Sequence, residues 1–366
     1  WVDLHGKLYN FGGTINISGT FCYWPYANGA HVEMSGGVID IKTCFLTIHN
    51  NYTWTHNITG GTIRMAYGFS GNRADFTPTA GIFEFYGPAD AAISQTNGCT
   101  IHDVVINKST SKSDETVIFG PIYDERTNEL ISDSTKDNKI SLGTNFTITG
   151  DLTVQTGNFD LNSYTCSIAD NASIFGNLIM NDALNDFSSY TLYWESGSTA
   201  DVTNGTFHVS QWQFKEGTTA KLGTGNTTYI TQSLYYPTSD QAEFGNLVRG
   251  PLSKNLIGDD PGKTYYPVKV MGNYTTKSGA SLYYQTEGVD LIVAGNAVIE
   301  NGASMTFSYG DFLVGGTLDL SGTLFIENGY SAIINGDLNF PSGSWLNLNS
   351  GNFACNHDAP AGILQL

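Results

Sequence analysis

Charged side chains are scarce in this sequence, where Asp, Glu, Lys and Arg make up only 14% of the 366 residues. An average globular protein carries roughly 25%. Basic residues are the scarcer kind, since 16 Lys and Arg against 34 Asp and Glu leave a net charge of −18. So acidic a surface repels the phosphates of nucleic acids and of anionic lipids. We therefore expect no nucleic-acid partner.

Long apolar runs and the familiar catalytic motifs are missing as well. No segment approaches the ~18 apolar residues that a membrane-spanning helix needs, so we expect no membrane insertion. We find no Gly-x-Ser-x-Gly, no His-Glu-x-x-His, no phosphate-binding loop, no EF-hand loop and no Cys-x-x-Cys pair, and we expect no cofactor. The chain opens at Trp1 without a signal peptide and ends at Leu366 without an end element. We expect a mature or excised fragment of a longer protein.

Glycine, polar turn formers and aromatic residues are abundant instead. The sequence holds 42 Gly, and aromatic residues make up 13% of it. Gly, Ser and Asn weaken helix interiors, whereas the aromatic content is enough for a large core. The composition therefore favours short strands joined by turns.

A repeat runs through the chain, in which Gly precedes an apolar–polar–apolar alternation typical of a half-buried strand. Its early copies begin 24, 24 and 20 residues apart, and the last three begin 21 and 20 residues apart. The copies are 13–17, 37–41, 61–65, 81–85, 150–154, 176–180, 295–299, 316–320 and 336–340. A second motif, Glu-Asn-Gly at Glu300 and again at Glu327, reads as the turn before another strand of the same repeat.

This period indicates a right-handed parallel β-helix, that is, an all-β solenoid. A leucine-rich repeat would need its own consensus, and a propeller blade would need about 40–50 residues. A β-helix turn cannot bury its inner face alone, and stacking of turns closes the core. Parallel crossovers favour the right hand. Turns of about 22 residues would number roughly 16.

Two regions interrupt the repeat. The densest charge in the chain lies near 108–140, beginning at Lys108, and we expect a solvated loop excursion there. Residues 234–270 carry four prolines and are expected to form a second, irregular excursion. We therefore expect a β-helix segment over residues 1–233 and a continuing β-helix segment over residues 271–366.

The one adjacent carboxylate pair is the best candidate for catalysis. A polysaccharide hydrolase needs carboxylates that converge on one groove, and Asp259 and Asp260 stand beside Arg249 and Lys263, which can orient an acidic sugar or abstract a proton. The alternative is a solvated loop tip, because Gly258-Asp259-Asp260-Pro261-Gly262 is a turn-forming string. Most signatures of pectinase-type hydrolases are missing, so we expect no enzyme.

Paired aromatic residues are the candidate binding surface. Neighbours in a strand point to opposite faces, so some of these rings face solvent, where they can stack on sugars or contact proteins. The residues are Tyr23, Trp24, Tyr26, Tyr235, Tyr236 and Tyr265. The alternative is an aromatic ladder inside the core.

The cysteines and the Gly-Asp turns allow two further sites. Cys22 and Cys44 lie about one period apart, so they are expected to stack, either as small core residues or as a disulfide in an oxidising compartment. Asp151 and Asp337 can bind Ca²⁺ between turns or simply cap the turns.

One stretch resembles a family of very large secreted proteins of Bacteroidota. Gly250-Pro251-Leu252-Ser253-Lys254 followed by Tyr266-Pro267-Val268 is similar to their "G-P-L-x-[RK] … [FY]-P-V-G" stretch, with Lys269 in place of the last Gly. The matching motif covers about 25 residues, and the general pattern of the sequence is similar over most of the chain. It implies export by the type IX secretion system, a cell-surface location and a role in adhesion or gliding motility.

We therefore expect a structural and binding module of a giant secreted adhesin, a stiff rod that presents loop-borne contact patches. Its partners would be a glycan or protein surface ligand and the secretion machinery. The alternative is a polysaccharide-active β-helix enzyme, either a lyase or a glycoside hydrolase, that uses Asp259, Asp260, Lys263 and Arg249.

Overall fold

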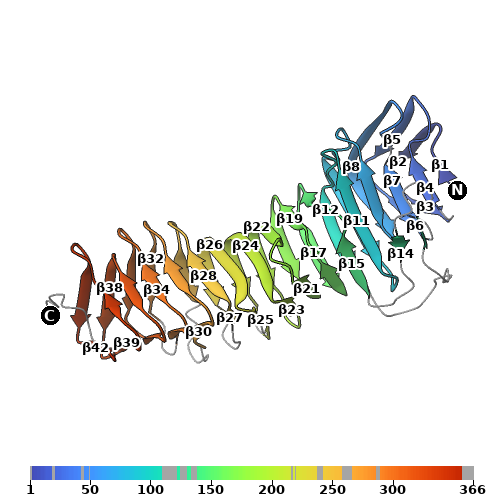
Figure 1. Ribbon diagram of the computed structural model, residues 1–366. Helices are drawn as coiled ribbons and strands as arrows, with labels where there is room; N and C mark the ends of the chain where they lie inside the picture. Colours follow the sequence, from blue (N-terminus) through green and yellow to red (C-terminus); the bar gives the residue numbers. More distant parts are fainter. Residues whose placement is uncertain are drawn as a thin grey trace. The chain divides into compact units, whose positions relative to one another are not determined.

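The computed structural model describes residues 2–18, 21–42, 45–48, 50–108, 122–123, 130–132, 138–215, 217–218, 220–236, 242–257, 266–285 and 289–356. Its secondary-structure elements are all strands, and parallel strands stack into a β-solenoid of about 14 turns (Figure 1). The predicted fold class is confirmed. The turns differ in length, because Ile15 pairs with Ile39, 24 residues later, whereas Leu318 pairs with Leu338, 20 residues later. The described part of the chain holds no helix able to span a membrane.

The chain divides into two compact units. Unit 1 comprises Trp1–Met180 and Leu184–Ser189, and unit 2 comprises Asn181–Ala183 and Tyr190–Leu366. Residues 234–270, expected to be an irregular excursion, contain four strands that pair in parallel with strands of other turns: β27 (Ala242–Phe244), β28 (Asn246–Arg249), β29 (Lys254–Ile257) and β30 (Val268–Val270). The solenoid therefore continues through this region, and only residues 237–241 and 258–265 lie outside the described part.

Unit 1 carries strands on three faces. The first face holds β2 (Lys7–Asn10), β5 (Ala30–Met34), the start of β8 (Trp54–Met65), β16 (Phe146–Ile148), β19 (Thr165–Ile168) and the start of β22 (Asp186–Trp194). The second holds β3 (Thr14–Ile17), β6 (Val38–Ile41), the end of β8, β10 (Ala80–Tyr86), β12 (Asp103–Asn107), β17 (Leu152–Thr156) and β20 (Asn171–Ile174). The third holds β1 (Val2–Asp3), β4 (Phe21–Trp24), β7 (Phe45–Ile48), β9 (Phe69–Asn72), β11 (Ala91–Thr96), β15 (Lys139–Leu142), β18 (Asn158–Asp160) and β21 (Asn177–Met180).

The register of the second face confirms the early repeat. Ile15 pairs with Ile39, Ile39 with Ile63, and Ile63 with Phe83, so equivalent positions of successive copies lie beside one another. The last three of these side chains are buried. Each apolar position thus adds to one continuous interior, as the alternation predicts.

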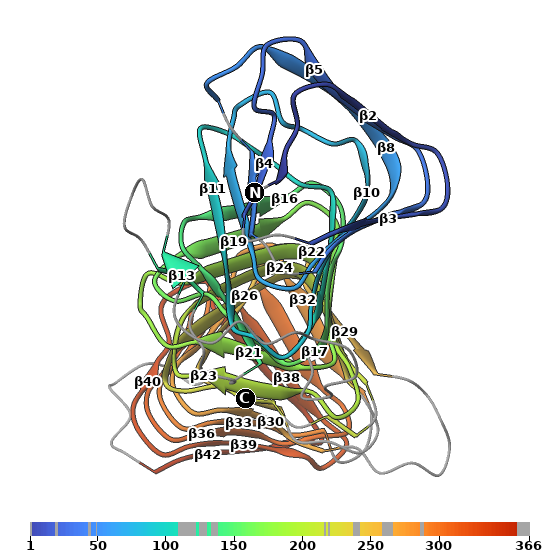
Figure 2. The ribbon, with the colours of Figure 1, turned by 90° about the vertical axis from the view of Figure 1, so that its right-hand side faces the viewer.

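Unit 2 has the same construction. One face holds β25 (Ala220–Lys221), β27 (Ala242–Phe244), β30 (Val268–Val270), β33 (Leu291–Val293), β36 (Phe312–Val314), β39 (Ser331–Ile334) and β42 (Asn352–Cys355). A second holds β24 (Asn204–Phe214), β26 (Gly225–Tyr236), β28 (Asn246–Arg249), β31 (Tyr274–Thr276), β34 (Ala297–Ile299), β37 (Leu318–Leu320) and β40 (Leu338–Asn339), with β29 (Lys254–Ile257) beside the end of β26. A third holds β32 (Ser281–Tyr284), β35 (Ser304–Phe307), β38 (Thr323–Glu327) and β41 (Trp345–Asn349), and β23 (Thr199–Val202) completes the list. Figure 2 shows β30, β33, β36, β39 and β42 lying one behind another.

Aromatic rings fill part of the interior of unit 2. Trp194 and Trp212 stack with centroids 5.6 Å apart, and Phe307 stacks between Tyr284 and Phe312 at 4.3 and 5.1 Å. All five side chains are buried. The stack of Tyr284 on Phe307 joins successive turns and is the ladder that the sequence left open as the alternative to exposed aromatics.

A column of glycines marks one corner of unit 2. From the second glycine onward, each N–H donates to the carbonyl of the glycine one turn earlier, at 2.6 to 3.0 Å. The glycine column consists of Gly245, Gly272, Gly295, Gly316 and Gly336. Next to it, Asn273 N donates to Asn246 Oδ1, Asn296 N to Asn273 Oδ1, and Thr317 N to Asn296 Oδ1, each at 2.9 Å. These side chains satisfy turn N–H groups that have no backbone partner.

The region near 108–140 departs from the parallel winding, although not at its first residue. Strands β13 (Ile122–Tyr123) and β14 (Leu130–Ser132) form a separate antiparallel pair. Lys108, expected in a solvated loop, is fully buried instead, and its Nζ donates to the carbonyl oxygens of Ala66 at 2.7 Å and Tyr86 at 2.9 Å. The prediction for Lys108 was wrong, because it lies two residues after Ile106 on the inward side of β12.

Candidate functional site

Only one of the four predicted catalytic residues can be placed. Asp259, Asp260 and Lys263 lie outside the described residues. Arg249 occupies an inward position of β28 and is 1% exposed. A guanidinium inside the core cannot orient an external sugar, so the prediction for Arg249 was wrong.

The predicted aromatic surface is only partly described. Trp24 is 1% exposed and belongs to the core, so its predicted contact role was wrong. Tyr265 and the side chains of Tyr23 and Tyr236 lie outside the described part, and Tyr235 is half-buried.

Tyr26 belongs to a row of rings along one corner of unit 1. Its ring lies 5.5 Å from that of His5 and 5.6 Å from that of Tyr52. Both tyrosines keep part of their surface exposed, and His5 is exposed. The row offers edges and faces of rings to solvent, as a surface for sugars or apolar side chains requires.

The proposed stacking of Cys22 on Cys44 was wrong. The β4–β7 register places Leu46 beside Cys22. Cys44 itself lies outside the described residues, so a disulfide between the two stays a prediction. Asp151 acts as a turn cap, because its Oδ1 accepts from Asn171 N at 2.8 Å.

A charged surface on the second face of unit 1 is the best-formed candidate site. We call it the Asp40–Glu84 face, and it comprises Asp40, Arg64, Glu84, Tyr86 and Asn107. Asp40 pairs with Arg64 across β6 and β8, and Arg64 with Glu84 across β8 and β10. Tyr86 and Asn107 form the next aligned pair, on β10 and β12. Alternation along each strand turns these side chains away from the core, although Asp40 keeps only 8% exposure.

These five side chains bind one another. Arg64 Nε donates to Glu84 Oε2 at 2.7 Å, and Asn107 Nδ2 donates to Glu84 Oε1 at 3.1 Å. The Tyr86 hydroxyl donates to Asp40 Oδ1 at 2.7 Å, and the Arg64 guanidinium lies 4.4 Å from the centroid of the Tyr86 ring. The Arg64 side chain retains 34% exposure, whereas that of Glu84 retains 16%. The face is thus held in one geometry and stays open at its arginine.

Both carboxylates of this face already have protein partners. An inverting or retaining hydrolase needs one carboxylic acid and one carboxylate directed at the same bond. Here Glu84 is shared by a guanidinium and an amide, and Asp40 by a phenol and, at 4.0 Å, the ammonium of Lys42. The arrangement presents fixed donors and acceptors and suits recognition of a polar ligand better than proton transfer.

The residues of this face can be found from the aligned copies of the repeat. Asp40, Arg64 and Glu84 occupy the same position in the copies that begin at Gly37, Gly61 and Gly81. The apolar positions alone define the repeat. When the copies stack, the polar residues that lie between the apolar positions become neighbours and form the site.

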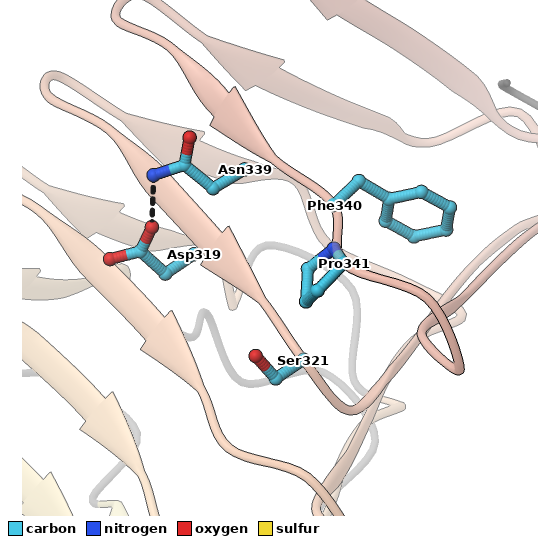
Figure 3. Close-up of a pocket in the computed structure, with 5 residues that line it drawn as sticks. All are labelled: Asp319, Ser321, Asn339, Phe340 and Pro341. Atoms are coloured by element: carbon cyan, nitrogen blue, oxygen red, sulfur yellow. Dashed lines mark hydrogen bonds between the residues drawn. The ribbon is translucent and has the colours of Figure 1, made fainter. Parts of the chain in front are cut away.

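A hollow of about 550 Å³ lies on unit 2, lined by Asp319, Ser321, Asn339, Phe340 and Pro341 (Figure 3). Asp319 of β37 and Asn339 of β40 are aligned neighbours, and Asn339 Nδ2 donates to Asp319 Oδ1. Pro341 faces the same hollow from the turn after β40, as Figure 3 shows. Polar groups on one side and an apolar ring on the other form a second, smaller candidate for a sugar.

Among the described residues, no three His, Cys, Asp or Glu side chains lie close enough together to form a metal site. Ca²⁺ binding stays a prediction. Comparison with protein-family models, with curated proteins and with solved structures finds no match to this chain.

Proposed function

We propose that this chain is a non-enzymatic structural and binding module of a large secreted cell-surface protein, and that the Asp40–Glu84 face binds a glycan. One observation carries the proposal: Arg64, Glu84, Tyr86 and Asn107 are bonded into a fixed, partly exposed polar surface on a rigid parallel sheet. A preorganised face costs less entropy when it binds than a mobile loop does.

An adhesive role agrees with the repetitive scaffold. Stacked turns present the same outward positions again and again, so contact patches can recur along one face. Several weak contacts on one scaffold raise the total avidity without any single tight site. The row of His5, Tyr26 and Tyr52 and the Asp319 hollow would serve as further patches.

Export by the type IX system and a place at the cell surface of a Bacteroidota cell are part of the same proposal. The support is the resemblance of Gly250–Lys254 and Tyr266–Val268 to large adhesins or gliding proteins of that group. The secretion machinery would be a partner, and the surface ligand a glycan or a protein.

A polysaccharide lyase or hydrolase is the second candidate, because β-helices often carry such activity. Arg249 is buried and could not contact its substrate, whereas Asp259, Asp260 and Lys263 lie outside the described residues and stay candidates. The partners of Asp40 and Glu84 favour binding over acid–base work.

The test combines binding and turnover. The full chain is mixed with neutral and with acidic polysaccharides, binding is followed by affinity electrophoresis, and products are assayed as new reducing ends and as unsaturated sugars. We expect retarded migration on at least one polysaccharide and no new ends. Turnover above a buffer control would contradict the proposal.

Three variants test whether the Asp40–Glu84 face is the surface that binds the polysaccharide. Tyr86→Ala and Glu84→Gln should each weaken retardation at least about tenfold in affinity, since each removes a partner that orders Arg64. Glu300→Gln, which breaks an outward ion pair in unit 2, is the matched control and should bind as the wild type does. Equal binding by all four proteins would contradict the assignment to this face.

A further inference from the structure

Arg249 places a positive charge inside unit 2, and the described residues offer it no counter-charge. Its side chain is 1% exposed, Nη1 donates to Asn255 Oδ1 at 2.7 Å, and Nη2 donates to the carbonyl oxygen of Lys254 at 2.8 Å. Both acceptors are neutral. Among the described residues, no carboxylate lies within ion-pair distance of this guanidinium. An isolated buried charge of this kind costs several kcal/mol, so a compensating group is required.

Within the described part of the chain, three buried polar groups around this charge have no hydrogen bond of good geometry, and the Tyr274 hydroxyl has only the nearby hydroxyls of Tyr284 and Thr276 beside it. They are Arg249 Nε, Asn255 Nδ2 and the Tyr274 hydroxyl. The Asn255 amide has only one sensible orientation, because its oxygen faces Nη1 of the guanidinium and its NH₂ must therefore point elsewhere. All three groups can donate a hydrogen bond.

The two described phenols beside Arg249, those of Tyr274 and Tyr284, supply no negative charge. Tyr274 is fully buried and Tyr284 is 2% exposed. Burial raises the pKa of both phenols, so neither becomes a tyrosinate that could balance Arg249. The Thr276 hydroxyl donates to Met305 Sδ at 3.1 Å, and the other face of Tyr284 is covered by Phe307.

A buried monocation surrounded by unsatisfied donors is the environment that a small monovalent anion needs. We propose that Arg249, Asn255 and Tyr274 bind a halide ion, chloride under ordinary conditions, inside unit 2. The ion neutralises the guanidinium and accepts from Nε–H, from the Asn255 NH₂ group and from the Tyr274 hydroxyl. A divalent anion would not neutralise the site, because it would replace the buried net charge of +1 by one of −1.

The ion would act as a structural ligand that joins adjacent turns. Arg249 comes from β28, Asn255 from β29 and Tyr274 from β31, and β31 is the strand aligned with β28. A halide that bridges these strands binds the folded protein and not the unfolded chain, so halide concentration should raise the stability of unit 2.

Crystallography with bromide gives the direct test. The full chain is unfolded, refolded in sodium bromide so that the buried site can exchange, and crystallised from bromide. We expect an anomalous peak at the bromine edge within hydrogen-bond distance of Arg249 Nε. Surface bromide peaks together with a water-filled or empty site beside Arg249 would overturn the proposal.

Thermal unfolding gives an independent test in solution. Sodium chloride and sodium methanesulfonate are compared at equal ionic strength. We expect Tm to rise by about 3 °C for each tenfold increase of chloride above its dissociation constant, and to change little with methanesulfonate. Equal responses to the two salts would contradict the proposal.

Three variants separate halide binding from a general salt effect. Arg249→Met should abolish the difference between chloride and methanesulfonate. If that variant does not fold, Tyr274→Phe keeps the charge, removes one donor and should reduce the difference. Lys277→Met breaks an ion pair with Glu300 in the same unit and should keep the full difference. A full chloride response in Tyr274→Phe and in Arg249→Met would overturn the assignment.

Discussion

The backbone N–H of Gly295 donates to the carbonyl oxygen of Gly272, one turn earlier, at 2.9 Å. A Cβ added to Gly295 would lie 2.6 Å from that oxygen and 2.7 Å from Asn273 Oδ1. The turns approach so closely at this corner that no side chain fits between them. The repeat begins with Gly for a steric reason at this position, since its backbone does not adopt a positive φ.

Gly295→Ala is therefore expected to destabilise unit 2 by about 1–3 kcal/mol through overpacking against the backbone of the previous turn. The measurement is the midpoint of urea unfolding followed by circular dichroism. Gly12→Ala is the control, because a Cβ there would meet no atom within 4 Å. An equal midpoint for Gly295→Ala and the wild type would contradict the close packing of the column.

The glycine column shows how far the sequence alone could go. Gly295, Gly316 and Gly336 were aligned as successive repeats, and their mutual hydrogen bonds confirm the alignment. The alignment of Gly150 with Gly176 was wrong, because the strands after them lie on different faces: β17 pairs with β20, whereas β21 pairs with β18. A turn has several Gly corners, and spacing alone does not tell them apart.

The inward charged residues were harder to foresee. Charged side chains are rarely buried, so Lys108 was expected in a solvated loop and Arg249 in an open catalytic site. Strand alternation pointed the other way, since Arg249 follows Leu247 and Lys108 follows Ile106 at inward spacing. The composition does not reveal which groups accept hydrogen bonds from a buried cation. For Lys108 they are backbone carbonyl oxygens, which come close to it only because the turns stack.

Asn296 tests the side-chain ladder beside the glycine column. Its Oδ1 accepts from Thr317 N at 2.9 Å, so Asn296→Ala leaves that N–H without its acceptor. We expect a loss of about 0.5–1.5 kcal/mol in the free energy of unfolding, because Asn296 is exposed and water can replace part of the bond. Asn296→Asp keeps an acceptor and should lose less, as Asp337 follows Gly336 at the equivalent position. Equal losses in the two variants would contradict a role for the acceptor.

Glu300 provides a pH-dependent contribution to stability. Lys277 Nζ donates to Glu300 Oε1 at 2.6 Å, and this hydrogen bond holds the pKa of Glu300 below its ordinary value of 4.5. The contribution is therefore complete above about pH 4.5 and is lost as the pH falls through the lowered value. The Glu300 side chain is 34% exposed, which limits the effect to that of a surface pair, about 0.2–1 kcal/mol. Urea unfolding at pH 7 and at the lowest pH that keeps the fold should show Glu300→Gln weaker at the first and equal to the wild type at the second.

The thiols of unit 1 and unit 2 should differ in reactivity. Cys99 and Cys166 are buried, and burial raises the pKa of Cys99 to about 12 and that of Cys166 further still. At pH 8 the thiolate fraction of Cys99 is then on the order of one in ten thousand, and the thiolate is the form that reacts. Cys355 of β42 is only half-buried, so iodoacetamide can reach it.

Native protein treated with iodoacetamide at pH 8 and digested for mass spectrometry should therefore carry label at Cys355 before Cys99 or Cys166. Raising the pH to 9 should not alter this order, because the pKa of Cys99 still lies about three units above the pH. Denaturation in urea removes the burial, so all three thiols should then be labelled at similar rates. Rapid labelling of Cys99 in the native protein would mean that the turns around Gly71, where an added Cβ would meet the Cys99 sulfur, open far more often than a continuous stacked core allows.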